Sequence, residues 1–383
     1  MPSILVSSLS LLLLAHIVLV AATAAPPPAT GVTSPINAAA ATNAKAQQSI
    51  PIIDIAPLIS PTSNLSQRQR VADQMGAACS EIGFFAIVNH GISSATVESL
   101  LASSRKFFDM AEQEKMLAKS DDDKEYPYGY ERSEVLSKGK RLDRTVERED
   151  ECSSSPDLKE TFSLGPRLSL DGRLARRWPP KLPSDDEFIS NHEEYYATME
   201  QLAQSLLRGF ALALGLDEDY FRPFFADDHQ CALRTLNYPD TGRSLRPGQI
   251  RAGAHTDYGA LTILKTGGPG LQVRRDVAQQ DQGWIDAPDL DDAFIVNVGD
   301  MMRRWTNDKW ASTLHRVVVA PSTGTADDRR QSVAFFVNAR GDAVVEPLPT
   351  CVSEKNPAKY EPVTAGDYLL RKHLASMGSS ELK

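Results

Sequence analysis

The chain contains little cysteine and no closely spaced cysteine pair. Its 383 residues include four cysteines, which are Cys79, Cys152, Cys231 and Cys351. Without a Cys-x-x-Cys pair, a zinc site built from cysteines is excluded. Cys79 and Cys231 lie in apolar runs, so we expect them to be buried thiols, although a disulfide would be possible in a secreted protein.

The sequence also lacks a basic cluster with interleaved aromatic residues. Lysine and arginine number 41 against 50 aspartate and glutamate residues, which gives a net charge of −9. This balance gives no support to binding of nucleic acid or an anionic membrane. Hydrophobic residues make up 42% and charged residues 24%, as is usual for a soluble globular protein, and we expect a monomer.

Long uncharged apolar runs are absent, apart from one at the beginning of the chain. Residues 9–25 carry no charge and end in Ala22-Thr23-Ala24, a small-x-small pattern typical of a signal-peptide cleavage site. We therefore predict a signal or targeting segment at residues 1–25, followed by a low-complexity linker at 26–49. A membrane anchor is the alternative, but the run is shorter than the roughly 20 residues a span needs.

The destination of the processed protein stays open between the secretory or endomembrane pathway, another organelle and, without processing, the cytoplasm. We expect no membrane association after processing.

Residues 50–225 form the predicted N-terminal region of helices and strands. Short strands are predicted at 50–58, where Pro57 closes the run, and at 83–92, and helices at 62–80 and 94–110. A longer helix begins at Ser184, where Glu187 completes a capping box, and ends at Gly215. The intervening residues 120–183 are predicted to be long loops with short pieces of structure.

Short strands dominate the region that follows, at residues 226–350, with a C-terminal segment at 351–383. The predicted strands span 231–238, 252–257, 260–265, 270–275, 283–287, 293–298, 313–319, 332–338 and 343–346. So many short strands with no long helix between them indicate an antiparallel barrel or jelly roll. Together with the preceding helices, this predicts an α+β fold.

A candidate metal site lies in the strand-like run AHTDYGALTIL at 254–264. Side chains alternate in a strand, so His255 and Asp257 should share a face, with Thr256 opposite. His315, in the run STLHRVVVA, is the candidate third ligand. Two imidazoles and one carboxylate leave coordination positions open, an arrangement suited to Fe(II). A zinc hydrolase is the alternative, but no general-base motif is evident.

A candidate anion site follows in RRQSVAFFV at 329–337. Arg330 and Ser332 are two residues apart and should share one strand face, where a guanidinium and a hydroxyl could grip a carboxylate. Arg329 should point to the opposite face. Tyr238, in LNYPD, could donate to the same anion. The alternatives are a solvent-exposed edge arginine and a tyrosine that only forms a turn.

Several segments, taken in order, resemble the iron(II)/2-oxoglutarate-dependent dioxygenase superfamily, and within it the isopenicillin N synthase-like branch. These segments are IPIIDIAPL, GFFAIVNHGI, LNYP, HTDYGALTIL, NVGDMMRRWTNDKWASTLHRVV and RQSVAFF. The resemblance implies a double-stranded β-helix, a cupin-like jelly roll, flanked by N-terminal helices. It also implies that His255, Asp257 and His315 bind iron, and that Asn297, Gly299 and Asp300 belong to a structural motif.

The resemblance further implies that Arg330, Ser332 and Tyr238 bind 2-oxoglutarate as co-substrate. The expected activity is hydroxylation or desaturation of a small organic molecule with O₂, releasing succinate and CO₂, with ascorbate as a candidate reductant. Two alternatives stay open: an Fe(II) oxidase of the isopenicillin N synthase type that uses no 2-oxoglutarate, and a jelly-roll binding protein without catalysis.

Overall fold

The computed structural model describes ten stretches of the chain, all within the compact unit formed by residues 48–383. They are 49–119, 128–132, 157–167, 176, 178–182, 185–226, 229–240, 250–277, 280–319 and 328–376. The predicted targeting segment and linker lie outside the described residues, apart from Ser49 at the end of the linker. Among the helices of the described stretches, none has the length and apolar character needed to cross a bilayer.

The first half of this unit alternates helices with short strands. The elements are β1 (Ile52–Asp54), α2 (Ala56–Ile59), α3 (Leu65–Glu81), β2 (Phe84–Val88), α4 (Ser94–Phe108), α5 (Glu112–Met116), β3 (Gly129–Glu131), β4 (Glu160–Leu164), α6 (Asp185–Ala213) and the 3-10 helix η3 (Arg222–Phe225). The predicted first strand is too long, because Pro57 lies in the first turn of α2, where its missing N–H is tolerated.

The second half is built mainly from strands. Its elements are β5 (Ala232–Tyr238), β6 (Ala252–His255), β7 (Leu261–Lys265), β8 (Leu271–Val277), β9 (Gln280–Asp286), β10 (Phe294–Val298), α7 (Asp300–Trp305), β11 (His315–Val317), β12 (Arg330–Val337), β13 (Val344–Val345), the 3-10 helix η4 (Pro349–Cys351), β14 (Val363–Thr364) and α8 (Ala365–Ser376). Each of the nine strand ranges predicted from 231 onward overlaps one of these strands.

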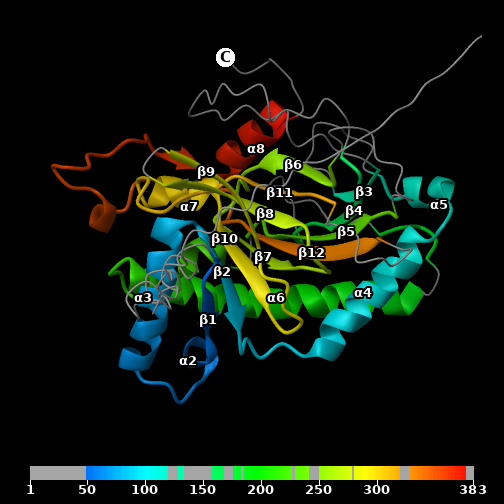
Figure 1. Ribbon diagram of the computed structural model, residues 1–383, viewed down its shortest axis with the longest axis horizontal. Coiled ribbons are helices and arrows are strands. Elements are labelled where there is room, and N and C mark those ends of the chain that lie inside the picture. Colours follow the sequence, from blue (N-terminus) through cyan, green and yellow to red (C-terminus); the bar gives the residue numbers. More distant parts are fainter. Residues whose placement is uncertain are drawn as a thin grey trace, which may run out of the picture. The chain divides into compact units, whose positions relative to one another are not determined.

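Two sheets carry the functional residues. The larger has the strand order β1-β2-β10-β7-β12-β5-β4-β3, and the smaller has the order β6-β11-β8-β9. All pairings within them are antiparallel except that of β1 with β2. In Figure 1 the smaller sheet lies over the larger one, and side chains from both line a common cavity.

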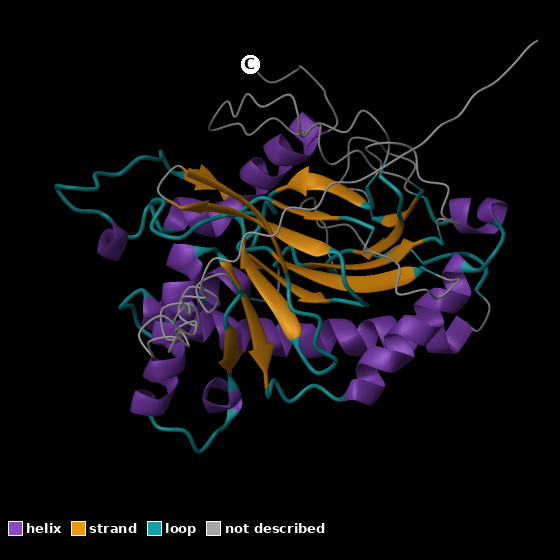
Figure 2. Cartoon of the chain, in the orientation of Figure 1, coloured by secondary structure: helices purple, strands orange, loops and turns teal. Residues whose placement is uncertain are grey.

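The long helix α6 packs beneath the larger sheet (Figure 2). Its residues predicted to face the core are all buried: Tyr196, Met199, Ala203, Leu206 and Phe210. Helices α3 and α4 pack against α6, and the Phe210 ring meets Phe85 of β2 edge-on at 6.4 Å between centroids. Gly215 follows the helix with φ +70°, a conformation that favours glycine at a helix end. The side chains of the predicted capping box at 184–187 lie partly outside the described residues.

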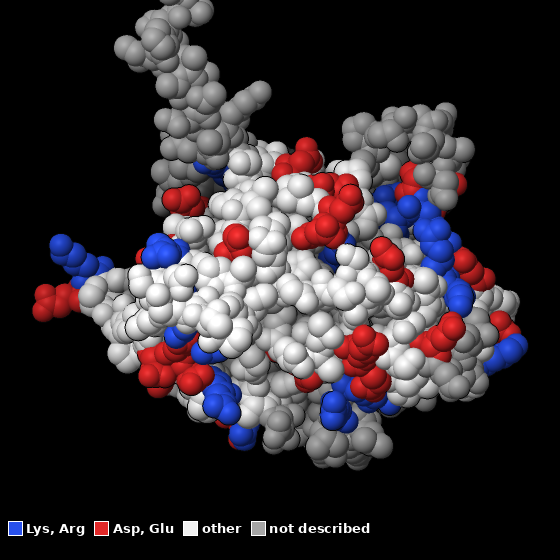
Figure 3. Space-filling view, turned by 90° about the horizontal axis from the view of Figure 1, so that it is seen from below, with Lys and Arg blue, Asp and Glu red and all other residues white. Residues whose placement is uncertain are grey.

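Charged residues do not separate by sign on the face shown in Figure 3. Lysine and arginine lie among aspartate and glutamate there, with uncharged surface between them. The buried thiols predicted at Cys79 and Cys231 are observed as free, buried cysteines.

Candidate metal centre and co-substrate site

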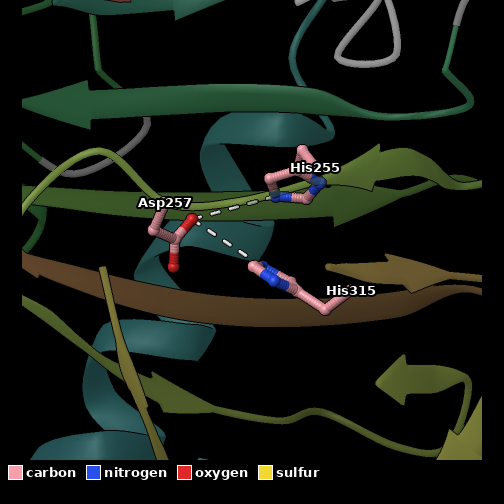
Figure 4. A group of neighbouring side chains, drawn as sticks. All are labelled: His255, Asp257 and His315. Carbon is pink, nitrogen blue, oxygen red and sulfur yellow. Dashed lines mark ion pairs between the residues drawn. The ribbon is translucent and has the colours of Figure 1, made fainter. Parts of the chain in front are cut away.

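Three side chains predicted as metal ligands converge between the two sheets. His255 ends β6 and lies opposite His315, the first residue of β11, so that their ring centroids are 4.3 Å apart. Oδ1 of Asp257 lies 3.9 Å from Nε2 of His255 and 3.7 Å from Nε2 of His315 (Figure 4). One ligand atom from each residue falls within 4.8 Å of the others.

The local backbone of this site differs from the prediction. Strand β6 stops at His255, so Asp257 lies in the irregular segment after the strand rather than on it. Its carboxylate nevertheless reaches the imidazoles, while Thr256 turns away and donates to Oδ2 of Asp300 at 3.1 Å. The side chains therefore separate as strand alternation predicts, although the strand itself has ended.

Both imidazoles are held in the tautomer that a metal requires. Nδ1 of His255 lies 2.7 Å from the Gly253 carbonyl, and Nδ1 of His315 lies 3.1 Å from the Thr313 carbonyl. Because a carbonyl can only accept, each Nδ1 carries the proton and each Nε2 keeps its lone pair for the metal. Burial, followed by the neighbouring His315, lowers the pKa of His255 to about 3, so this ring is neutral near pH 7.

Two neighbouring strands fix the carboxylate of Asp257. Its Oδ2 accepts from the Thr262 hydroxyl at 2.6 Å and from the Asn297 amide at 2.7 Å. These two donors are opposite one another on β7 and β10. Burial acts to raise the pKa of Asp257, but the imidazoles and these two hydrogen bonds outweigh it and lower the pKa. The carboxylate is therefore charged, and Oδ1 remains directed at the imidazoles.

The donor set fits a divalent transition metal with open positions. Two imidazole nitrogens and one carboxylate oxygen lie on one side of the site, without a thiolate, and this is the arrangement of non-haem Fe(II) oxygenases. Three protein ligands leave coordination positions for other molecules.

The motif at Asn297, Gly299 and Asp300 packs against the backbone of the segment that carries Asp257. A side chain at Gly299 would place its Cβ 2.2 Å from the Gly259 carbonyl oxygen, so only glycine fits there. Asp300 is buried and accepts from Ser312 at 2.6 Å, while Lys372 of α8 forms an ion pair with it at 2.6 Å. The motif thus connects the metal-binding segment to the C-terminal helix.

A second buried ion pair supports His255. Nζ of Lys159 lies 3.4 Å from Asp157, and both side chains are almost fully buried. Oδ1 of Asp157 accepts from the Gly253 N–H at 3.0 Å, and the Gly253 carbonyl binds the His255 ring. The carboxylate of Asp157 therefore fixes the peptide that orients one candidate metal ligand.

Arg330, Ser332 and Tyr238 come together as predicted. Arg330 on β12 lies opposite Tyr238 on β5, and its guanidinium carbon is 5.0 Å from the tyrosine ring centroid. Its Nε donates to the Gly268 carbonyl at 3.1 Å, whereas Nη1 and Nη2 are buried without a hydrogen-bond partner among the described residues. Since a buried cation without partners is costly, this pair of N–H groups fits a carboxylate ligand. Arg329 points away, as predicted, and binds Asp109.

A cavity joins this anion site to the metal centre. Its volume of about 130 Å³ is roughly ten times the 10–15 Å³ that one water molecule needs. The lining includes all six predicted site residues: Tyr238, His255, Asp257, His315, Arg330 and Ser332. It also includes Leu369, His373 and Ser376, which place helix α8 along one wall.

Several lining residues are missing from the sequence prediction, although strand alternation could have found some of them. Every second residue of a strand shares a face, so Phe336 lies on the same face of β12 as Arg330, and Arg234 lies on the same face of β5 as Tyr238. Both Phe336 and Arg234 line the cavity. Lys159 and the donor Thr262 have no comparable signal, because only the fold brings them to the site. Trp305 and Phe335 belong to the buried core and are not among the lining residues.

Comparison with known proteins places this geometry in a family. The model described as "non-haem dioxygenase in morphine synthesis N-terminal" matches residues 50–185, and that of the 2OG-Fe(II) oxygenase superfamily matches residues 228–339. The homoarginine-6-hydroxylase of Oryza sativa subsp. japonica is 32% identical over 349 residues, covering 86% of this chain and 98% of that protein. The 2-oxoglutarate-Fe(II) type oxidoreductase hxnY of Emericella nidulans is 30% identical over 347 residues, covering 86% and 91%.

A solved structure agrees with these relatives. A full-length protein of Neurospora crassa, crystallised in complex with alpha-KG, superimposes with a TM-score of 0.73 at 27% identity, covering 85% of this chain and 96% of that one. The chain belongs to the 2-oxoglutarate- and Fe(II)-dependent oxygenase superfamily. It is an oxidoreductase that uses Fe(II), 2-oxoglutarate and O₂, and the 2-oxoglutarate-independent alternative is not supported.

Proposed function

We propose that His255, Asp257 and His315 hold the Fe(II) ion, and that Arg330, Ser332 and Tyr238 bind the distal carboxylate of 2-oxoglutarate. The observation that carries this assignment is the convergence of the two Nε2 atoms and Oδ1 of Asp257 at one end of the cavity. At the other end, Nη1 and Nη2 of Arg330, which have no hydrogen-bond partner in the part of the chain that the structure describes, supply the donors that a carboxylate needs.

Iron and 2-oxoglutarate together supply an oxidant from O₂ that is strong enough to break a C–H bond. The residues of this chain set the conditions for that chemistry. Thr262 and Asn297 keep Asp257 charged and directed at the metal position, and the carbonyls of Gly253 and Thr313 orient the two imidazoles through Nδ1. Most of the lining side chains are buried, so electrostatic interactions along the cavity wall are stronger than they would be in water.

The substrate of the reaction is a small organic molecule, and we propose hydroxylation as the outcome, with desaturation as the alternative. The hydroxylase name of the rice relative supports this proposal, as does the thymine bound in a second crystal structure of the Neurospora crassa protein. Helix α8 and the residues along β5 and β12 would contact the substrate, because they line the part of the cavity not assigned to the co-substrate.

The finer predictions about architecture and setting remain proposals. We infer a jelly roll at residues 226–350, flanked by helices of the region 50–225 and followed by the segment 351–383. The packing of α3 and α4 on α6 supports this division. The isopenicillin N synthase-like branch, ascorbate as reductant, a monomeric state, the absence of nucleic-acid binding and a targeting segment at 1–25 stay predictions.

The assignment can be tested by anaerobic reconstitution. Fe(II) is added to the purified protein, 2-oxoglutarate is titrated, and the weak visible charge-transfer band of the iron-bound keto acid is followed. We expect a saturable band in the wild type and in His90→Ala, which changes a half-buried histidine outside the site. His255→Ala should lack the band, and a band of full intensity in that variant would remove His255 from the ligand set.

A further inference from the structure

A second buried arginine lies beside the proposed co-substrate site. Arg251 is 3% exposed and directly precedes β6. Its guanidinium carbon lies 5.8 Å from the ring centroid of Tyr238, and the guanidinium carbon of Arg330 lies 5.0 Å from the same ring. Both distances are within the roughly 6 Å over which a cation interacts with an aromatic ring. One tyrosine of the site therefore interacts with two guanidinium groups.

Arg251 connects the two sheets at this end of the cavity. Its backbone N–H donates to the carbonyl of Val317, on β11 of the smaller sheet, at 2.9 Å. Its side chain reaches Tyr238 on β5 of the larger sheet, and Nη2 donates to the carbonyl of Asp328, two residues before Arg330 begins β12. Val317, Tyr238 and Arg330 all line the cavity. Arg251 therefore joins three segments that form the wall around the proposed co-substrate site.

Arg251 also brings a second positive charge to this end of the cavity. Its Nη2 lies 3.5 Å from the Asp328 carboxylate, whereas Nε is buried and has no hydrogen-bond partner among the described residues. Burial and the charge of Arg330 together lower the pKa of Arg251 more than the Asp328 carboxylate raises it. Two neighbouring buried cations repel each other, and an anion bound beside them offsets both the repulsion and the cost of burial.

We propose that Arg251 is a positioning residue of the co-substrate site, which holds the Tyr238 ring and the beginning of β12 so that Tyr238 and Arg330 meet the distal carboxylate of 2-oxoglutarate. This inference rests on the proposed function, which assigns Arg330, Ser332 and Tyr238 to that carboxylate. Arg251 does not itself line the described cavity, so it acts through Tyr238 and through its charge rather than by touching the co-substrate.

The test compares two keto acids that differ only at the end facing these arginines. 2-Oxopentanoate has the same chain length as 2-oxoglutarate and carries a methyl group in place of the distal carboxylate. Each keto acid is titrated into the anaerobic protein loaded with Fe(II), and the charge-transfer band gives its Kd. The ratio of the two Kd values measures the preference for the distal carboxylate, whereas a general loss of structure would raise both Kd values together.

The wild type should bind 2-oxoglutarate roughly 30-fold or more tightly than 2-oxopentanoate, because the methyl group leaves the guanidinium of Arg330 without its partner. Arg251→Gln should reduce this preference by about 3–30-fold, the loss expected when a buried cation–π contact is removed. The Kd of 2-oxopentanoate should stay unchanged in this variant, because the iron-binding end of the keto acid is the same.

Three further variants complete the comparison. Arg251→Lys keeps a cation without the planar guanidinium, so its preference should fall between those of the wild type and Arg251→Gln, and it serves as the test if the glutamine variant does not fold. Arg68→Gln is the matched control and should keep the full preference, because Arg68 of α3 pairs with Glu218 at 2.9 Å and does not line the described cavity. Arg330→Met should lose most of the preference.

The outcomes distinguish the two levels of the assignment. A wild type without preference for 2-oxoglutarate, or an unchanged preference in Arg330→Met, counts against the proposed function itself. If Arg330→Met loses the preference, an unchanged ratio in Arg251→Gln overturns only the role of Arg251, and so does an unchanged ratio in Arg251→Lys where the glutamine variant does not fold. An equal loss of preference in Arg68→Gln overturns that role as well.

Discussion

Replacement of Arg330 by methionine isolates the contribution of its charge to co-substrate binding. The side chain is 4% exposed, its Nε is bound to the Gly268 carbonyl, and Nη1 and Nη2 have no hydrogen-bond partner among the described residues. Methionine keeps an unbranched apolar side chain and removes the guanidinium with its N–H donors. Truncating one member of a buried, hydrogen-bonded charge pair costs about 2–5 kcal/mol, so the Kd for 2-oxoglutarate should rise from roughly 30-fold to several thousand-fold.

The assay is an anaerobic titration of 2-oxoglutarate at fixed Fe(II), with iron affinity measured separately without the co-substrate. Arg330→Met should bind iron as the wild type does, because the guanidinium contacts none of the three ligands. Arg329→Met is the matched control: the neighbouring arginine faces Asp109 and Asn237 on the other side of β12. Unchanged 2-oxoglutarate affinity in Arg330→Met, or an equal loss in Arg329→Met, would refute the reasoning.

Three further predictions test the support of the site and of the fold. Thr262→Val removes one donor to Asp257 and should lower Fe(II) affinity by about 10–100-fold in a metal-binding titration. Gly299→Ala places a methyl group against the Gly259 carbonyl and should lower the free energy of unfolding by about 1–3 kcal/mol in urea. Burial lowers the pKa of His192 to about 4 from 6.5, so its contribution to stability is lost as pH falls between these values. At pH 4.5 this effect lowers the free energy of unfolding of the wild type by roughly 2–3 kcal/mol, and His192→Leu should not show this loss. An unchanged dependence of the unfolding free energy on pH in the variant would contradict the prediction.

The candidate metal ligands were predictable because each lies in a strand-like run with an unusual polar residue. His255 and His315 interrupt apolar, β-branched segments, and a buried imidazole needs a partner. The strand prediction for Asp257 was wrong in detail, since β6 ends two residues earlier. Thr256 and Asp257 nevertheless point in different directions, because the Thr256 hydroxyl donates to Asp300.

Other parts of the site depend on contacts between distant segments, which no local pattern reports. Asp157 and Lys159 belong to a stretch predicted as loop, yet they end beside His255 because β4 pairs with β5 and the segment before it meets β6. Thr262 acts on Asp257 only through the register of β7 with β10. Such residues follow from the pairing of strands, and pairing is decided by the packing of the whole sheet.

The pairing of β5 with β12 decides which residues of the two strands face the cavity. The strands are antiparallel, with Arg330 opposite Tyr238, and Ser332 lies two residues further along β12 on the same face. Because side chains alternate, a slip of one residue would turn Arg330 and Ser332 away from the cavity together. Replacing Arg330 alone should therefore weaken 2-oxoglutarate binding, whereas disturbing the pairing should remove the whole proposed co-substrate site.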